Sequence, residues 1–335
     1  MNKIEFPRTS YDGSKLYQEA LKDWFLKNVN VRKNKIKYNM SKRLEDLAAN
    51  LDKKEEKDIL DCITRHLDDL LIASPEKLLR YTKVVDNRYK GVFAQKNEYG
   101  IWKATSFGEK ILKAFNYDGY QKNKLKELAE KLNVKTCPYC NMHYTLFAEK
   151  EGTKKENKLT KFQFDHFFDK AEYPFLSMSL YNLIPSCAVC NQAKSTSTLD
   201  LRFHPYHSAI CEQFHFEVEN PRLLYSGAKK DKININIIND MNEDKGELSS
   251  FIETFHIKNL YSRHKDIAQE TFDKAYEDPY YLNPSNFNFL DIKDSEYLQR
   301  LWMGTYPSTD DIEKRPMTKF IQDLWNQAKQ QQDDL

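Results

Sequence analysis

Two short stretches decide what this chain can fold into: Thr136-Cys137-Pro138-Tyr139-Cys140 and Cys187-Ala188-Val189-Cys190-Asn191. Each holds two cysteines separated by two residues, the spacing at which a tight turn presents two sulfur atoms to one metal ion. Two such pairs supply the four thiolates of a closed tetrahedral zinc site. We therefore expect one structural Zn²⁺, held by Cys137, Cys140, Cys187 and Cys190.

The composition supports metal binding over disulfide formation. The chain has 335 residues, with 52 Lys and Arg against 50 Asp and Glu, so its formal net charge of +2 gives no strong overall attraction to nucleic acid. No apolar run is long enough to span a membrane, and the first residues do not form a signal peptide, so we expect a cytoplasmic protein. Cysteines stay reduced there, which leaves metal binding as the better use of four of the six. A thioredoxin-like redox pair is the alternative, but the surrounding pattern does not favour it. Cys62 and Cys211 are expected to be buried or inert thiols.

The first 130 residues are predicted to be helical. Apolar residues recur at helical spacing over 41–51 and 59–72, and Ser74-Pro75 is typical of a helix start. A further helix is expected over 106–116, where Glu109 follows Ser106 at capping-box spacing, and another over 122–132.

The central and last regions are predicted to mix strands and helices. Between the cysteine pairs, 141–148 and 161–168 are short and aromatic, which favours strands, and the lysine-rich loop 149–161 between them could contact phosphates or simply be solvated. A short helix is expected to begin after Asn191. Beyond it we expect a strand at 232–238 and helices at 260–277 and 316–331. The fold class is therefore α+β and mainly helical, with a helical region 1–130, a zinc-bracketed core 131–215 and a mostly helical region 216–335.

The residues that promise chemistry lie inside the cysteine brackets. Phe164-Asp165-His166-Phe167 is followed by Asn182-Leu183-Ile184-Pro185 and then by Asn191 and Lys194. An Asp-His pair and an Asn beside a zinc site are what a second, catalytic divalent ion and its water need. This order and spacing resemble the HNH endonuclease family and its ββα-metal fold, over residues 136–200.

The resemblance implies a role for each motif residue. His166 matches the general base that activates water against a phosphodiester, and Asn182 matches the residue that holds the loop and this base in place. Asp165 and Asn191 match the ligands of the catalytic ion. Since the last position is Asn and not His, Mg²⁺ or Mn²⁺ is preferred over a softer ion. Lys194 stands where a basic residue lies near the substrate phosphate.

Simpler interpretations stay open for several of these residues. Asn191 could cap a helix, and Lys194 could be an ordinary surface charge. His204 and His207 are spaced for a metal ion, but we expect the motif residues to supply its ligands. His143 is expected to pack or to contact phosphate.

The function implied by the resemblance is endonucleolytic hydrolysis of DNA, with cleavage of RNA as an alternative. A zinc-dependent module that only binds nucleic acid or a protein partner is the alternative from another class. More loosely, a zinc-bracketed HNH core with helical flanks looks like the HNH subunit of bacterial antiphage defence systems of the Septu and retron types, in which a partner ATPase controls the nuclease. The chain has no Walker-type loop, so ATP use would belong to such a partner.

Overall fold

The structure is a computed structural model that describes residues 1–6, 17–27, 31–32, 35–36, 39–121, 124–149, 158–160, 162–225, 233–243, 246–281, 285 and 295–333. Helices dominate it, and its strands form small antiparallel pairs, which confirms a mainly helical α+β chain. Most of the lysine-rich loop at 149–161 lies outside the described residues. Within the described part, no helix has both the length and the apolar character to cross a membrane.

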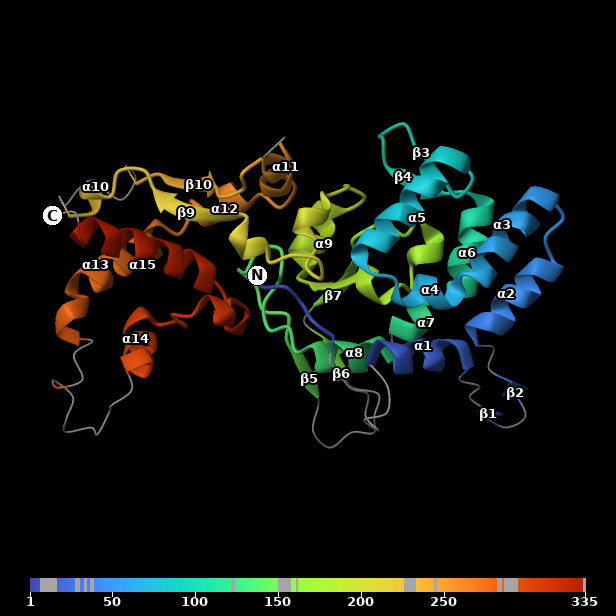
Figure 1. Ribbon diagram of the computed structural model, residues 1–335, viewed down its shortest axis with the longest axis horizontal. Coiled ribbons are helices and arrows are strands. Elements are labelled where there is room, and N and C mark those ends of the chain that lie inside the picture. The colour runs from blue at the N-terminus through green and yellow to red at the C-terminus, as the bar shows by residue number, and fades with distance from the viewer. Residues whose placement is uncertain are drawn as a thin grey trace.

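The N-terminal region is a layer of helices with two small strand pairs (Figure 1). Its helices are α1 (Tyr17–Lys27), α2 (Met40–Ala49), α3 (Lys54–Arg65), α4 (Leu67–Ile72), α5 (Pro75–Arg88), α6 (Ser106–Phe115), α7 (Tyr117–Gln121) and α8 (Lys124–Leu132). Its strand pairs are β1 (Val31–Arg32) with β2 (Lys35–Ile36), and β3 (Ala94–Lys96) with β4 (Trp102–Ala104).

Capping residues set several of these helix ends. Ser74 accepts a hydrogen bond from the Lys77 N–H and Pro75 opens α5, as predicted. The helix expected over 59–72 is instead broken at His66, whose N–H closes the last turn of α3 before α4 begins. The cap of α6 is Thr105 and not Ser106, because the Thr105 side chain accepts from the Gly108 N–H.

The middle of the chain folds as two strands and a helix. β7 (Gln163–His166) pairs antiparallel with β8 (Leu183–Ser186), and α9 (Ala188–Lys194) follows at once. The 3₁₀ turns η1 (Pro174–Leu176) and η2 (Leu180–Asn182) lie in the connection between the strands. α9 begins earlier than expected, at Ala188, because the sulfur of Cys187 caps it. Asn191 therefore lies inside the helix and is not its cap.

Between the first cysteine pair and β7 the predicted strand 141–148 is largely absent. The chain makes one bridge, Thr136 to Tyr144, and then β5 (Phe147–Glu149) pairs with β6 (Lys158–Thr160). Asn141 takes a left-handed conformation, with φ 49°, directly after Cys140, and this turn prevents an extended strand there.

The C-terminal region packs a strand pair against helices (Figure 1). β9 (Phe214–Val218) pairs with β10 (Ile235–Asn239), and α15 (Thr318–Asp333) lies along β9. The helix expected over 260–277 is divided into α12 (Ile257–Tyr261) and α13 (Lys265–Tyr281). The remaining helical elements are the 3₁₀ turns η3 (Leu201–Phe203), η4 (Ile210–Glu212) and η7 (Thr309–Lys314), and the helices α10 (Arg222–Tyr225), α11 (Glu247–Thr254) and α14 (Ser295–Met303).

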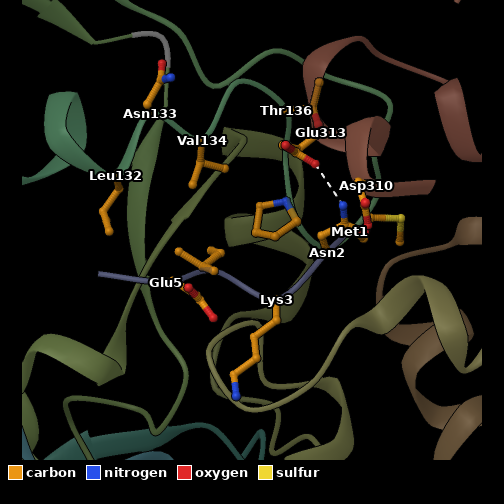
Figure 2. A pocket seen from close by; sticks show the side chains of 12 residues that line it. Met1, Asn2, Lys3, Glu5, Leu132, Asn133, Val134, Thr136, Asp310 and Glu313 are labelled. Carbon is orange, nitrogen blue, oxygen red and sulfur yellow. Dashed lines mark hydrogen bonds between the residues drawn. The ribbon is translucent and has the colours of Figure 1, made fainter. Parts of the chain in front are cut away.

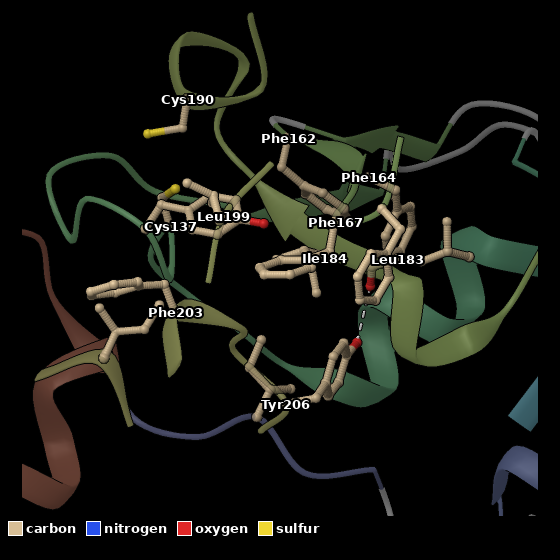
Figure 3. Packing of buried hydrophobic residues seen from close by; sticks show 14 of the residues in the cluster. Cys137, Phe162, Phe164, Phe167, Leu183, Ile184, Cys190, Leu199, Phe203 and Tyr206 are labelled. Carbon is tan, nitrogen blue, oxygen red and sulfur yellow. Dashed lines mark hydrogen bonds between the residues drawn. The ribbon is translucent and has the colours of Figure 1, made fainter. Parts of the chain in front are cut away.

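One continuous cluster of buried hydrophobic residues runs through the N-terminal, central and C-terminal regions. Around β7 and β8 it is mainly aromatic. Figure 3 shows Phe162, Phe164 and Phe167 packed there, with Tyr206 donating a 3.2 Å hydrogen bond to the Leu183 carbonyl. The division at 130 and 215 remains a prediction, since the core does not stop at either position.

Asn141 ties the first cysteine pair to the C-terminal region. Its side chain donates to the Thr136 hydroxyl at 3.0 Å and to the Ile312 carbonyl at 2.9 Å, and it accepts from the Lys319 N–H at 3.1 Å. Its backbone carbonyl accepts from the Met317 N–H at 2.6 Å. A fully buried amide with this many partners fixes the turn and the last helix together.

Replacing Asn141 should therefore loosen the chain far from any catalytic group. We expect Asn141→Ala to lower the free energy of unfolding by about 3 kcal/mol. The substitution leaves the buried hydrogen-bond partners of the Asn141 side chain unpaired and places an alanine in the left-handed conformation. Asn141→Gly tolerates that conformation and should lose about 1 kcal/mol less. Urea unfolding of both variants measures this. An Asn141→Ala variant as stable as the parent would show that the tie is unimportant.

Candidate functional site

The four paired cysteines form one buried cluster. Their sulfur atoms all lie within 4.8 Å of one another, and the Sγ atoms of Cys140 and Cys187 are 4.0 Å apart. Four sulfurs at 2.3 Å around a tetrahedral zinc ion would be separated by about 3.8 Å. Among the described residues this is the one cluster of three or more His, Cys, Asp or Glu with such geometry. The set could hold a metal ion such as zinc, with no place left for a substrate.

Backbone donors point at these sulfur atoms, as a thiolate site requires. The Met142 N–H donates to Cys140 Sγ and the Cys190 N–H to Cys187 Sγ, each at 3.4 Å. Burial raises the pKa of Cys137, whereas hydrogen bonding within the cluster, with Cys137 first, holds the pKa of Cys140 well below its usual range. A bound divalent cation would favour the deprotonated thiolate form of all four cysteines. His143 Nδ1 lies 3.8 Å from Cys140 Sγ, beside the cluster and not in it.

The two other cysteines lie apart from the cluster. Cys211 is partly buried, whereas Cys62 is exposed on α3, so of the expected buried or inert thiol only the inert alternative stays open for Cys62. It lines an apolar hollow between α3, α4 and α5. Its helix position turns it away from the packed face that Ile59, Leu60 and Ile63 supply.

Asp165 is buried on the side of β7 that faces α9. Its Oδ2 accepts a 2.8 Å hydrogen bond from the Tyr139 hydroxyl, and its Oδ1 lies 3.4 Å from Lys194 Nζ. Burial raises the pKa of the carboxyl, and the Lys194 charge opposes that effect. Tyr139 is itself stacked on Phe255 at 4.6 Å between ring centroids. Tyr139, which lies between Cys137 and Cys140, thus connects the cysteine cluster to Asp165.

Lys194 is fully buried and does not face solvent. Besides Asp165, its ammonium donates to the His166 carbonyl at 2.8 Å. This placement contradicts the expectation that Lys194 contacts a substrate phosphate. The ammonium is instead paired inside the core, because burying an ammonium without a partner costs far more free energy than burying a paired one.

Removing Lys194 should consequently reduce stability and not only activity. We expect Lys194→Met to lower the free energy of unfolding by about 3–5 kcal/mol, since it leaves the Asp165 carboxylate buried without its cation. Asp165→Asn combined with Lys194→Met removes both charges and should be the more stable of the two proteins. Chemical denaturation compares them. A double variant less stable than the single one would contradict this, and would show that the Asp165 carboxylate stabilises the core without Lys194, through its hydrogen bond from Tyr139.

Asn191 lies on the same side of β7 as Asp165. Its Nδ2 donates to Gln163 Oε1, and Gln163 and Asp165 share a face because strand residues alternate. The amide oxygen of Asn191 and the carboxylate of Asp165 are oxygen donors of the kind that Mg²⁺ and Mn²⁺ accept. The Lys194 ammonium competes for Oδ1, so an ion on Asp165 needs another of its lone pairs.

The His166 ring projects from the opposite face of β7. Its Nε2 lies 3.0 Å from the Ser177 carbonyl oxygen, which fixes that nitrogen as the protonated one and leaves the lone pair on Nδ1. Tyr117 of α7 packs edge-on against the ring, with centroids 4.6 Å apart. Burial, helped by the charges of Lys170 and Lys194, lowers the pKa of His166 to about 3. The ring is therefore neutral at physiological pH.

Asn182 fixes the loop on which the Ser177 carbonyl lies. Its Oδ1 accepts from the Phe168 N–H at 2.7 Å, and its Nδ2 donates to the carbonyls of Phe168 and Leu176. The side chain is fully buried, so these bonds are shielded from water. The residue thereby clamps the two ends of the segment that orients His166.

Sequence reasoning did not single out Tyr117, Ser177 or Lys170. Ser177 acts through its carbonyl, which any residue type would provide, so no sequence signal marks it. Tyr117 lies 49 positions before His166 and is brought to it only by tertiary packing. Lys170 lies four residues after His166 in the sequence. This closeness to the Asp-His pair was the one sequence signal that could have marked any of the three residues.

Other hollows and histidines lie outside this arrangement. Figure 2 shows a pocket of about 400 Å³ between the segment Met1–Glu5, residues 132–138, Asp310 and Glu313. Asn2 closes one side of it by donating to Glu313 Oε2 at 3.1 Å. His204 is fully buried against Phe167, with centroids 4.2 Å apart, and His207 instead bonds Glu76. The two histidines therefore do not form a metal site together.

No protein-family model matches the chain, and neither a curated protein nor a solved structure is similar to it at a significant level.

Proposed function

We propose that this protein is a metal-dependent HNH-type endonuclease that hydrolyses phosphodiester bonds, with DNA as its preferred substrate. The observation that carries the proposal is the neutral His166 ring, bound through Nε2 to the Ser177 carbonyl on a loop clamped by Asn182. A buried imidazole held by one nitrogen is the arrangement of a general base. The strand–strand–helix order around it and the four-cysteine cluster support the family resemblance.

In the proposed reaction His166 takes the proton of the attacking water at Nδ1. The hydrogen bond from Nε2 keeps the ring in the tautomer that this step needs. A pKa of about 3 makes the free ring a weak base. A phosphate beside it would raise that pKa towards neutrality, because it adds negative charge next to the protonated form.

Asp165 and Asn191 would hold the catalytic Mg²⁺ or Mn²⁺. A divalent ion there would supply the charge that stabilises the phosphoryl oxygens in the transition state. The four cysteines would hold Zn²⁺, which has a structural role because the set is closed and buried. Control by a partner ATPase, as in the defence systems named above, is part of the same proposal.

One observation favours a second function. Asp165 and Lys194 already satisfy each other in the core, as they would in a zinc-dependent module that binds nucleic acid or a protein and has lost catalysis. The two functions make opposite predictions for metal-dependent cleavage.

The test is to incubate zinc-loaded protein with supercoiled plasmid, single-stranded DNA and RNA, with and without Mg²⁺ or Mn²⁺. We expect divalent-dependent cleavage of DNA. Preferential cleavage of RNA would change the substrate but not the site. Binding to any of the polymers without cleavage, also after addition of the product of any neighbouring ATPase gene, would favour the binding module.

A further inference from the structure

Lys170 is a cation on the His166 side of the strand. It follows β7 by four residues and is half-buried. Its Nζ lies 4.8 Å from the centroid of the Tyr117 ring, the same ring that packs edge-on against His166. Tyr117 is held in turn by a 3.4 Å hydrogen bond from its hydroxyl to the Phe164 carbonyl.

The ammonium of Lys170 is available to bind an anion. Within the described part of the chain it has no carboxylate within ion-pair distance, and its neighbour Asp169 turns back to the N–H groups of Ala171 and Glu172. The Tyr117 ring contacts both this ammonium and the His166 ring, so the charge of Lys170 lies beside the histidine. Lys194, by contrast, is fully buried and forms an ion pair with Asp165.

Resting on the proposed nuclease function, we propose that Lys170, held over the face of Tyr117, binds the phosphate of the nucleic-acid backbone beside His166. A lysine ammonium is a compact charge that suits a single phosphate oxygen. The tyrosine face holds it by a cation–π contact, which keeps it half-desolvated without neutralising it. Tyr117 is then a positioning residue, contributed to the site by the N-terminal helical region.

The effect should be measured as nucleic-acid binding, so that it does not depend on cleavage. Fluorescence anisotropy of labelled 30-base-pair DNA, without added divalent ion, compares the parent with Lys170→Gln over a range of salt concentrations. Losing one phosphate contact should weaken binding about 5–10-fold at low salt and reduce the slope of log K against log salt by about 0.9. Lys170→Arg should restore most of the affinity.

Lys57→Gln is the matched control, because it removes the same charge from the exposed surface of α3, far from β7 (Figure 1). An affinity and a salt slope equal in Lys170→Gln and Lys57→Gln, in a protein that binds DNA, would overturn the role of Lys170 alone. A parent that binds neither DNA nor RNA would overturn the proposed function itself.

The role of Tyr117 needs a double-mutant cycle. Tyr117→Phe keeps the ring and should bind DNA as the parent does, whereas Tyr117→Leu should lose affinity. In the Tyr117→Leu background, Lys170→Gln should then have little further effect, because the two residues act as one unit. Fully additive losses, in variants that melt at the parental temperature, would contradict the coupling.

Discussion

Cys190→Ser is expected to abolish metal binding by the four-cysteine cluster and with it the folded core, whereas Cys62→Ser is expected to leave both intact. Cys190 is 1% exposed and lies within 4.8 Å of the three other paired sulfurs, but Cys62 is exposed on α3. A structural zinc ion contributes roughly 10 kcal/mol of apparent folding free energy in small zinc domains, as much as the entire stability of a typical domain.

The loss should spread beyond the cluster. The Tyr261 hydroxyl donates to the Cys140 carbonyl at 2.7 Å, and Tyr139 links the same turn to Asp165. We expect Cys190→Ser to lack a cooperative thermal transition for the central region, and metal analysis to give one zinc per chain in Cys62→Ser. An equal zinc content and melting temperature in the two variants would refute the structural zinc site.

His166→Ala should have the largest effect on activity. Loss of a positioned general base typically lowers a rate by about 10²–10⁴-fold. The fold should persist, because the alanine removes one hydrogen bond to Ser177 and one aromatic contact with Tyr117, and leaves the Asn182 clamp in place.

His66→Ala provides the control for this experiment. His66 is an exposed histidine at the end of α3, and its loss should change neither rate nor zinc content. Single-turnover cleavage rates at saturating Mg²⁺ make the comparison. A His166→Ala rate within threefold of that of His66→Ala would remove His166 from the mechanism.

The sequence predicted those parts of the site that depend on local spacing. Two cysteine pairs, each confined to one turn, could only converge if the chain between them doubled back, as β7 and β8 do. The start of α5 was predictable for the same reason, because Ser74 and Pro75 act on adjacent groups. The roles of Asp165, His166, Asn182 and Asn191 in catalysis remain predictions.

Tertiary contacts decided what the sequence could not show. From the sequence, Lys194 is expected to be a surface charge or a phosphate ligand, because lysine is seldom buried. Only the fold shows that Asp165, 29 residues earlier in the chain, lies beside it. The start of α9 was placed four residues late because a cysteine sulfur is an unusual cap. The strand β9 was not anticipated, although its alternating burial is plain once α15 covers it.

We propose that the β7–β8–α9 site hydrolyses nucleic acid with His166 as base. The most direct measurement is conversion of supercoiled plasmid to nicked and linear forms by wild-type protein and by His166→Ala, side by side, with Mn²⁺ or Mg²⁺. We predict divalent-dependent nicking by the wild type and none by the variant over the same time. Equal nicking by both proteins would contradict the account.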